Sequence, residues 1–285
     1  MTNGFKLSKC AINIDWSQTQ ESVMAIDIDE TTNQGAFILR HLPKQSRDFL
    51  NKLATDETQR ESRKRTFAAA IVNKMSNFTD VPTKEIRDYV ERILEDFSDE
   101  EYRSLSDDFF SYVSKIDVKV KTLLLQHRRE VFRNWIDTNR IIVKETYALP
   151  EEQILPIYTE GGLPKTLYDK EGKLNDFEKG IISKIGSMAS IQFWTRNTDR
   201  RGFCLNGYIN HYPDFIVVTQ SGLTVLVETK GDHLDGTDSE GKIELGASWS
   251  NLTHGRGKYF MVFKEKEVKG ARKVDAFLRL LEQLE

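Results

Sequence analysis

Unbroken apolar runs mark the second half of the chain. Residues 215–218 (FIVV) and 223–227 (LTVLV) are apolar or β-branched without polar alternation, which predicts two strands covered on both faces. Gln220, Ser221 and Gly222 lie between the runs and are turn formers. We therefore expect an antiparallel hairpin.

Helical and extended patterns surround this hairpin. Upstream, the stretch LNDFEKGIISKIGSM places apolar residues on one helical face after a cap at Asn175 or Asp176, and a strand is expected at residues 191–195. Downstream we expect a helix around residues 242–251, a strand at 258–263 and a closing amphipathic helix from 274 onward. The predicted order is helix, strand, hairpin, helix, strand.

The first half of the chain has a different pattern. AINIDW, SVMAIDID and GAFILRHL predict three short strands in a small sheet or meander. Helices follow, one with apolar residues at helical spacing over 83–97, and Ser98 with Glu101 predicts a capping box. Proline and glycine breaks over residues 144–165 mark a boundary, giving domains 1–150 and 151–285.

Three charged residues at the end of the apolar hairpin require an explanation, because buried charge is costly unless it is paired. If the turn is centred on Ser221, Asp214 lies directly opposite Glu228, and Lys230 shares their face. A slip of one residue would separate Asp214 from the other two. One interpretation is a buried ion pair, which leaves one acid uncompensated. The other is a site for a hard divalent cation.

The motif and its surroundings resemble a known family. Pro213-Asp214 followed by Glu228-Thr229-Lys230 is similar to the PD-(D/E)xK nuclease signature. The wider segment from Leu167 to Phe263 resembles the C-terminal endonuclease part of type III restriction enzyme Res subunits and related DEAD/DEAH helicase-nucleases. The resemblance implies a restriction-endonuclease-like α/β core, with a mixed central sheet flanked by helices, after a mainly helical N-terminal domain.

That resemblance also implies a chemistry. Asp214 and Glu228 are expected to bind Mg²⁺, or Mn²⁺ in its place, with the carbonyl of Thr229 as an extra ligand and Glu178 completing the acidic set. Lys230 would orient the attacking water or stabilise charge on the phosphate. Three arginines are candidates for phosphate contacts or are simply solvated: Arg196, Arg200 and Arg201.

No ATP site is expected in this chain, since it contains neither a G-x-x-x-x-G-K-[ST] loop nor a DEAD or DEAH tetrapeptide. The expected partners are DNA, a helicase or translocase region or subunit, and a modification subunit that recognises the sequence. The charge, 41 basic against 44 acidic residues, does not indicate strong independent DNA affinity. Cys10 and Cys204 form no framework, and neither a membrane span nor a signal peptide is indicated, so a cytoplasmic location is the default.

Other functions stay open on the sequence alone. The nuclease fold could serve as a DNA-binding or assembly module without cleavage, or the same site could act on RNA or branched DNA. The N-terminal half carries basic clusters, including Arg63, Lys64 and Arg65, that would meet phosphates or be solvated. A protein-interaction role for that half is a further alternative.

Overall fold

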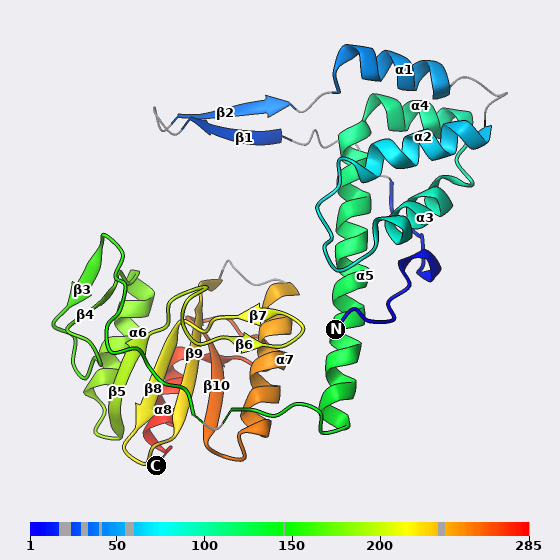
Figure 1. The fold of residues 1–285 in the computed structure, drawn as a ribbon. Helices are drawn as coiled ribbons and strands as arrows, with labels where there is room; N and C mark the ends of the chain where they lie inside the picture. The colour runs from blue at the N-terminus through cyan, green and yellow to red at the C-terminus, as the bar shows by residue number, and fades with distance from the viewer. Residues whose placement is uncertain are drawn as a thin grey trace. The chain divides into compact units, whose positions relative to one another are not determined.

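The chain is a mixed α/β protein that divides into two compact units, Met1–Arg133 and Asn134–Glu285 (Figure 1). The computed structural model describes residues 1–16, 24–29, 34–39, 42–54, 60–144, 146–232 and 237–284. The division between the units falls inside a helix, earlier in the chain than the boundary expected after residue 150.

Helices dominate the N-terminal unit. Its elements are the 3₁₀ turn η1 (Leu7–Lys9), strands β1 (Met24–Asp29) and β2 (Gln34–Leu39), helices α1 (Lys44–Ala54), α2 (Arg60–Val72), α3 (Thr83–Leu94) and α4 (Asp99–Asp107), and most of α5 (Phe109–Asp137). The predicted apolar face of α3 is buried. The predicted capping box is confirmed, because the Ser98 side chain accepts from the Glu101 amide and Glu101 accepts from the Ser98 amide.

One predicted strand in this unit is wrong. Residues 11–16 form no strand, while β1 and β2 pair antiparallel with Met24 opposite Leu39. Ile12, Ile14 and Trp16 pack instead on the helical core, where the Trp16 ring stacks 4.8 Å from Tyr112. The apolar alternation of this segment therefore reflects burial against helices rather than strand pairing. Residues 22, 23, 40 and 41, at the ends of the other two expected strands, lie outside the described residues.

A five-stranded mixed sheet organises the C-terminal unit. Its strand order is β11 (Arg272–Lys273), β10 (Gly257–Phe263), β9 (Thr224–Lys230), β8 (Phe215–Thr219) and β5 (Ile191–Arg196). β10 runs parallel to β9 and β11, whereas β8 is antiparallel to β9 and β5. Short ladders join β3 (Thr159–Gly161) to β4 (Lys170–Gly172) and β6 (Leu205–Asn206) to β7 (Asn210–His211). The predicted element order is confirmed, with β6 and β7 inserted before β8.

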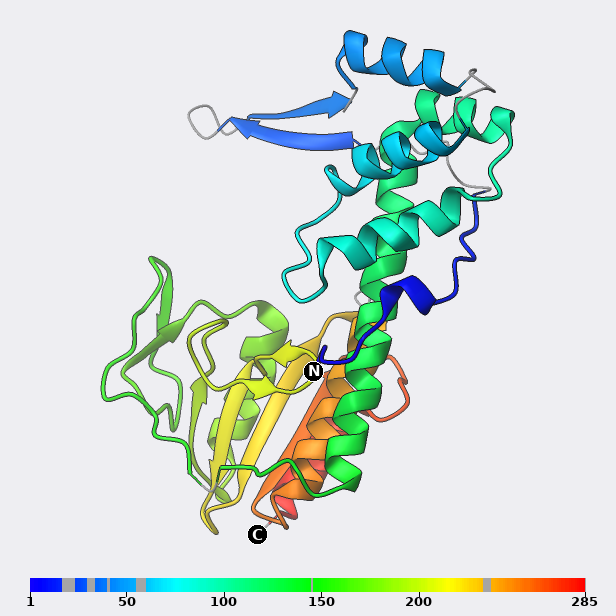
Figure 2. The ribbon, with the colours of Figure 1, turned by 45° about the vertical axis from the view of Figure 1, so that its right-hand side comes forward.

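Helices cover both faces of this sheet (Figures 1 and 2). Helices α6 (Asp176–Ser187) and α8 (Val274–Glu282) form a buried apolar cluster with alternate residues of β8, β9 and β10. Helix α7 (Thr237–Leu252) covers the other face, because neighbouring strand residues point to opposite faces. Phe260 lies 5.4 Å from Phe277 of α8, while the Tyr259 ring lies so close to Gly246 of α7 that a Cβ there would come within 2.1 Å of it.

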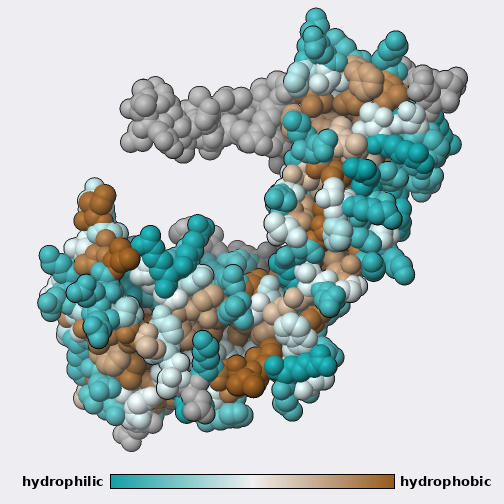
Figure 3. Space-filling view, viewed as in Figure 1, coloured by the Kyte–Doolittle hydropathy of each residue, from teal (hydrophilic) through white to brown (hydrophobic). Residues whose placement is uncertain are grey.

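A segment without helix or strand, residues 140–144 and 146–158, precedes the sheet, and we call it the strap. It is anchored to β5 by the Gln153 side chain, whose Nε2 donates to Thr195 Oγ1 at 2.8 Å. Several of its apolar side chains are exposed, including Ile142, Ile154 and Ile157, and Figure 3 shows apolar side chains on the surface of this unit. Among the described residues, no helix combines the length and apolarity that crossing a membrane requires.

Candidate active site

The β8–β9 hairpin has the register that its spacing predicts. Phe215 pairs with Val227 and Val218 with Thr224, so the pairing is centred on Ser221. The Thr219 amide donates to the Leu223 carbonyl at 3.0 Å, and Gly222 adopts φ +84°, a conformation that favours glycine. Extending this register by one pair sets Asp214 opposite Glu228.

Asp214 is held from two sides at the entrance to β8. Its Oδ2 accepts from the Thr229 amide at 2.6 Å and from Thr229 Oγ1 at 2.7 Å. Its backbone carbonyl accepts from the Asn197 amide at 2.8 Å, and Asn197 Nδ2 donates to the Pro213 carbonyl at 2.8 Å. Burial raises the pKa of Asp214 above its ordinary value, against the Thr229 hydrogen bonds. The Thr229 amide and hydroxyl thus orient this carboxylate, and the Thr229 carbonyl stays a predicted metal ligand.

Glu228 is the most perturbed acid of the hairpin. It is 5% exposed, and burial followed by the negative charge of Asp214 raises its pKa to about 7. Lys242 Nζ donates to Glu228 Oε1 at 3.1 Å, and Lys230 Nζ lies 3.9 Å from the same atom. Both cations lower the pKa of Glu228 without cancelling the rise. The half-buried Asp214 and the buried Glu228 therefore repel each other, even beside two lysines.

Lys242 is a site residue that the sequence did not assign. It lies on α7, where it also forms an ion pair with Asp238 at 3.0 Å, and Lys230 lies 3.6 Å from the same Asp238 carboxylate. Burial acts to lower the pKa of Lys242, but the Glu228 and Asp238 carboxylates raise it overall, so the side chain is cationic. The only sequence signal was the (i, i+4) spacing of Asp238 and Lys242, which by itself indicates an ordinary helical pair.

His211 and Tyr259 close the other side of Glu228. His211 is almost fully buried, its Nε2 lies 2.9 Å from the Tyr259 hydroxyl, and it lies 4.0 Å from Glu228 Oε2. Burial and the charge of Lys242 lower the pKa of His211 to about 3, and burial and Glu228 raise that of Tyr259 well above 10. Both rings are thus neutral near pH 7 and add no charge to offset Glu228.

Glu178 is adjacent to this site but already bonded. Asn175, one of the two residues expected as the cap, caps α6, and Glu178 completes a capping box with it. Both Glu178 oxygens also accept from Arg196, at 3.0 and 3.1 Å, and the Arg196 guanidinium lies 5.6 Å from the Phe215 ring. The charge of Glu178 raises the pKa of Asp214, and that of Arg196 lowers it. Glu178 and Arg196 therefore act as a neutral pair that flanks Asp214.

The other predicted contacts lie on the loop after β5. Arg200 and Arg201 are exposed, and Arg200 Nε is 3.6 Å from Asp199. His254 lies in the turn after α7, while His233 falls outside the described residues. The loop is fixed by Asn197, whose Oδ1 accepts from the Phe203 amide at 2.8 Å.

A metal fits this donor set through two carboxylates. No group of three or more Asp, Glu, His or Cys side chains able to hold a metal occurs in the described part of the chain. Mg²⁺ is commonly bound by one or two carboxylates, with waters and substrate phosphates as the other ligands. Asp214 and Glu228 are hard oxygen donors in mutual repulsion, which a divalent cation would relieve. Glu178 fits less well, since Arg196 already neutralises it.

The chain was compared with family models, curated proteins and solved structures. No family model, no curated protein and no solved structure matches this chain.

Proposed function

We propose that this chain is a metal-dependent endonuclease that hydrolyses DNA phosphodiester bonds at Asp214, Glu228 and Lys230. The observation that carries the proposal is the pair of facing carboxylates, Glu228 buried and Asp214 half-buried, with the pKa of Glu228 raised to about 7 although two lysines lie beside it. Perturbed acids of this kind cluster at functional sites. The hairpin between α6 and α7, and the resemblance to PD-(D/E)xK nucleases, further support it.

The reaction is hydrolysis by water. One bond forms between the water oxygen and phosphorus, the bond from phosphorus to a sugar oxygen breaks, and the leaving oxygen gains a proton while water loses one. Mg²⁺ bound by Asp214 and Glu228 would polarise the phosphate and lower the pKa of a bound water. Lys230 and Lys242 carry the positive charge that opposes charge building up on the phosphoryl oxygens. Thr229 and Asn197 keep Asp214 oriented.

The wider assignment is also a proposal. The resemblance supports a place in a type III restriction-like or other helicase-nuclease phage-defence system, in the cytoplasm. A motor region or subunit would deliver the DNA, and a modification subunit would recognise the sequence. The near balance of basic and acidic residues agrees with a nuclease that another component holds on DNA.

A second function has a specific observation in its favour. Lys242 is ion-paired with both Glu228 and Asp238, which is how a purely structural buried acid is accommodated. In that case the unit would bind DNA or assemble with a partner without cutting. The second carboxylate speaks against it, because the charge of Asp214 adds to burial in raising the pKa of Glu228, and a purely structural acid gains nothing from facing another acid.

The test is nicking of supercoiled plasmid by wild type, Asp214→Asn and the exposed loop control Asp199→Asn. Each protein is assayed with Mg²⁺, with Mn²⁺ and with EDTA, and an RNA of equal length is included as an alternative substrate. We expect metal-dependent nicking by wild type and Asp199→Asn only. If Asp214→Asn still nicks plasmid, the assignment of the active site to Asp214 is wrong. DNA binding without nicking by the wild type would favour a role in DNA binding or assembly without cleavage.

A further inference from the structure

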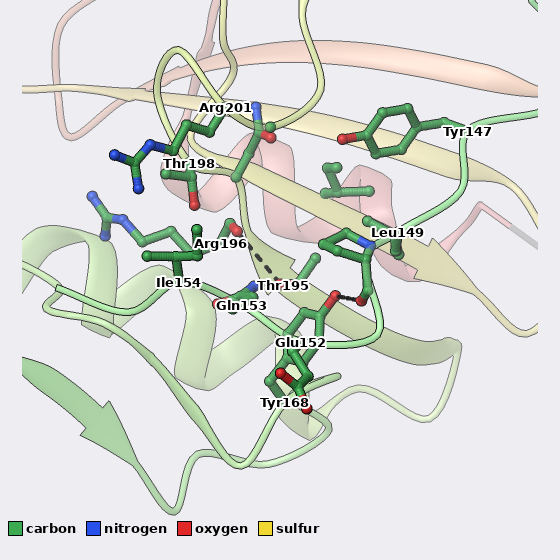
Figure 4. A pocket seen from close by; sticks show the side chains of 14 residues that line it. Tyr147, Leu149, Glu152, Gln153, Ile154, Tyr168, Thr195, Arg196, Thr198 and Arg201 are labelled. Carbon is green, nitrogen blue, oxygen red and sulfur yellow. Dashed lines mark hydrogen bonds between the residues drawn. The ribbon is translucent and has the colours of Figure 1, made fainter.

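A pocket lies beside the candidate site, within the C-terminal unit (Figure 4). Its volume is about 200 Å³, smaller than the roughly 300 Å³ at which pockets for drug-sized ligands begin. Strands β5 and β8 contribute Thr195 and Ile216 to its lining, the strap contributes residues between 147 and 154, and the loop after β5 contributes Thr198 and Arg201. A space of this size suits one planar ring system.

The pocket has two chemically different ends. Figure 4 shows Arg196, Arg201 and Thr198 on one side and Tyr147 and Leu149 on the other. Arg196 is committed to Glu178, whereas no carboxylate of the described residues is recorded within ion-pair distance of Arg201. The pocket thus offers aromatic and apolar surface at one end and an available cation at the other.

The walls of the pocket are fixed by hydrogen bonds. Gln153 Nε2 donates to Thr195 Oγ1 at 2.8 Å, a bond that leaves the Gln153 carbonyl oxygen Oε1 as a further acceptor. Tyr168 lines the pocket, and its hydroxyl donates to the Pro150 carbonyl, which ties the strap down. Gly202 closes the loop so tightly that a Cβ there would lie 2.1 Å from Asn197 Oδ1. These contacts hold the strap and the loop after β5 in place around the pocket.

One residue connects the pocket directly to the catalytic acid. Asn197 lines the pocket, and its amide donates to the Asp214 carbonyl at 2.8 Å. A ligand in the pocket would thus be adjacent to the chain that positions Asp214. This contact links the lining of the pocket to Asp214 through a single residue.

We infer that the pocket receives a nucleobase of the strand being cut, with the attached phosphate directed toward Arg201. This inference rests on the proposed function. Aromatic rings stack on any base, an amide and a hydroxyl can read the edge of one base, and arginine matches a phosphate. The base must leave its stack to enter, so single-stranded or locally unpaired DNA is the favoured substrate.

The test measures nucleotide binding without metal, so that it does not depend on cleavage. Saturation-transfer NMR is recorded for the four deoxynucleoside 5′-monophosphates in EDTA, with wild type, Asp214→Asn, and two pocket variants. Thr198→Trp fills the space from an exposed loop position, and Gln153→Leu removes the polar edge at similar volume. Ile157→Trp, on the strap but 94% exposed, is the matched control.

We expect ring-proton signals with wild type, Asp214→Asn and Ile157→Trp, and binding about tenfold weaker in both pocket variants. Absence of ring signals with wild type, or signals unchanged in Thr198→Trp and Gln153→Leu, would overturn the inference. Nucleotide binding without plasmid nicking would support the nucleotide pocket and contradict the proposed nuclease activity. Plasmid nicking without nucleotide binding would support the nuclease activity and contradict the nucleotide pocket.

Discussion

The two units treat buried charge in opposite ways. In the N-terminal unit, Arg63 is 2% exposed and donates to the Ala54 carbonyl at 2.9 Å and to Asp99 at 2.7 Å, with its guanidinium 4.2 Å from the Tyr102 ring. In the C-terminal unit, Asp214 and Glu228 face each other as like charges. A buried cation with a full set of partners is accommodated by the fold itself, whereas facing carboxylates that two lysines compensate only in part are typical of a site where a ligand adds positive charge.

The largest effect is expected from removing one charge of the acidic pair. Glu228→Gln should lower plasmid cleavage by about 10³-fold, because the site loses one of the two carboxylates that would hold the metal at the reacting phosphate. The thermal midpoint should stay equal or rise, since the repulsion with Asp214 disappears. Plasmid nicking and thermal unfolding are measured on the same preparation. A large fall in the midpoint would instead assign Glu228 to the fold.

The pH dependence of stability should separate the two kinds of buried charge. The folded-state pKa of Glu228, about 7, exceeds its ordinary 4.5, so its stabilising contribution is complete below pH 4.5 and is lost as pH rises through 7. The loss is on the order of 3 kcal/mol. His211, with its pKa lowered from 6.5 to about 3, acts in the opposite sense, since its contribution is lost as pH falls below 6.5.

Thermal unfolding in EDTA from pH 5 to 8 measures this dependence. The stability of wild type relative to Glu228→Gln should fall across the range, and added Mg²⁺ should restore it most at the alkaline end. Parallel curves for the two proteins would contradict the raised pKa of Glu228.

In the N-terminal unit, loss of the buried cation Arg63 should lower stability. Arg63→Met should destabilise this unit by about 2–3 kcal/mol, because it leaves Asp99 and the Ala54 carbonyl without their donor, although Asp99 is partly exposed. Arg65→Met, at an exposed position of the same helix, should change stability by less than about 0.5 kcal/mol. Denaturant unfolding of both variants makes the comparison, and equal effects would mean that Arg63 is as dispensable as a surface cation.

Local sequence information was sufficient for the hairpin and the caps. The turn residues and the apolar run on either side set the pairing about Ser221, and the caps at Ser98 and Asn175 depend on residues three apart. These features depend on residues that lie within a few positions of one another, and for that reason the sequence pattern predicted them correctly.

The misses all involve contacts between distant segments. Lys242 reaches Glu228 from a separate helix, and His211 is buried against Tyr259, which is far along the chain. Arg63 was expected to be solvated or to meet phosphates, but tertiary packing buries it against Tyr102. Residues 11–16 have a strand-like alternation that helical packing uses instead. Spacing alone carries no signal for such contacts.

The two lysines beside Glu228 should differ in effect. Lys242→Met removes the closer cation, at 3.1 Å, and should raise the pKa of Glu228 further, whereas Lys230→Met, at 3.9 Å, should raise it less. Cleavage should fall about 100-fold in Lys230→Met with metal affinity nearly unchanged. Carboxyl NMR titration, metal titration and nicking provide the three readouts. Loss of metal affinity in Lys230→Met would contradict a role toward the phosphate.

The smallest effect is expected from removing a helix N-cap. Both units contain the same capping box, so the same change can be compared in each of them. Ser98→Ala and Asn175→Ala should each cost about 1 kcal/mol of stability. Only Asn175→Ala should also lower nicking, by a few fold, because fraying the start of α6 loosens the Glu178–Arg196 pair that flanks Asp214. Thermal unfolding and nicking of the two variants are compared. Equal nicking would mean that Glu178 stabilises α6 without influencing the site, and the acidic pair would then stand alone.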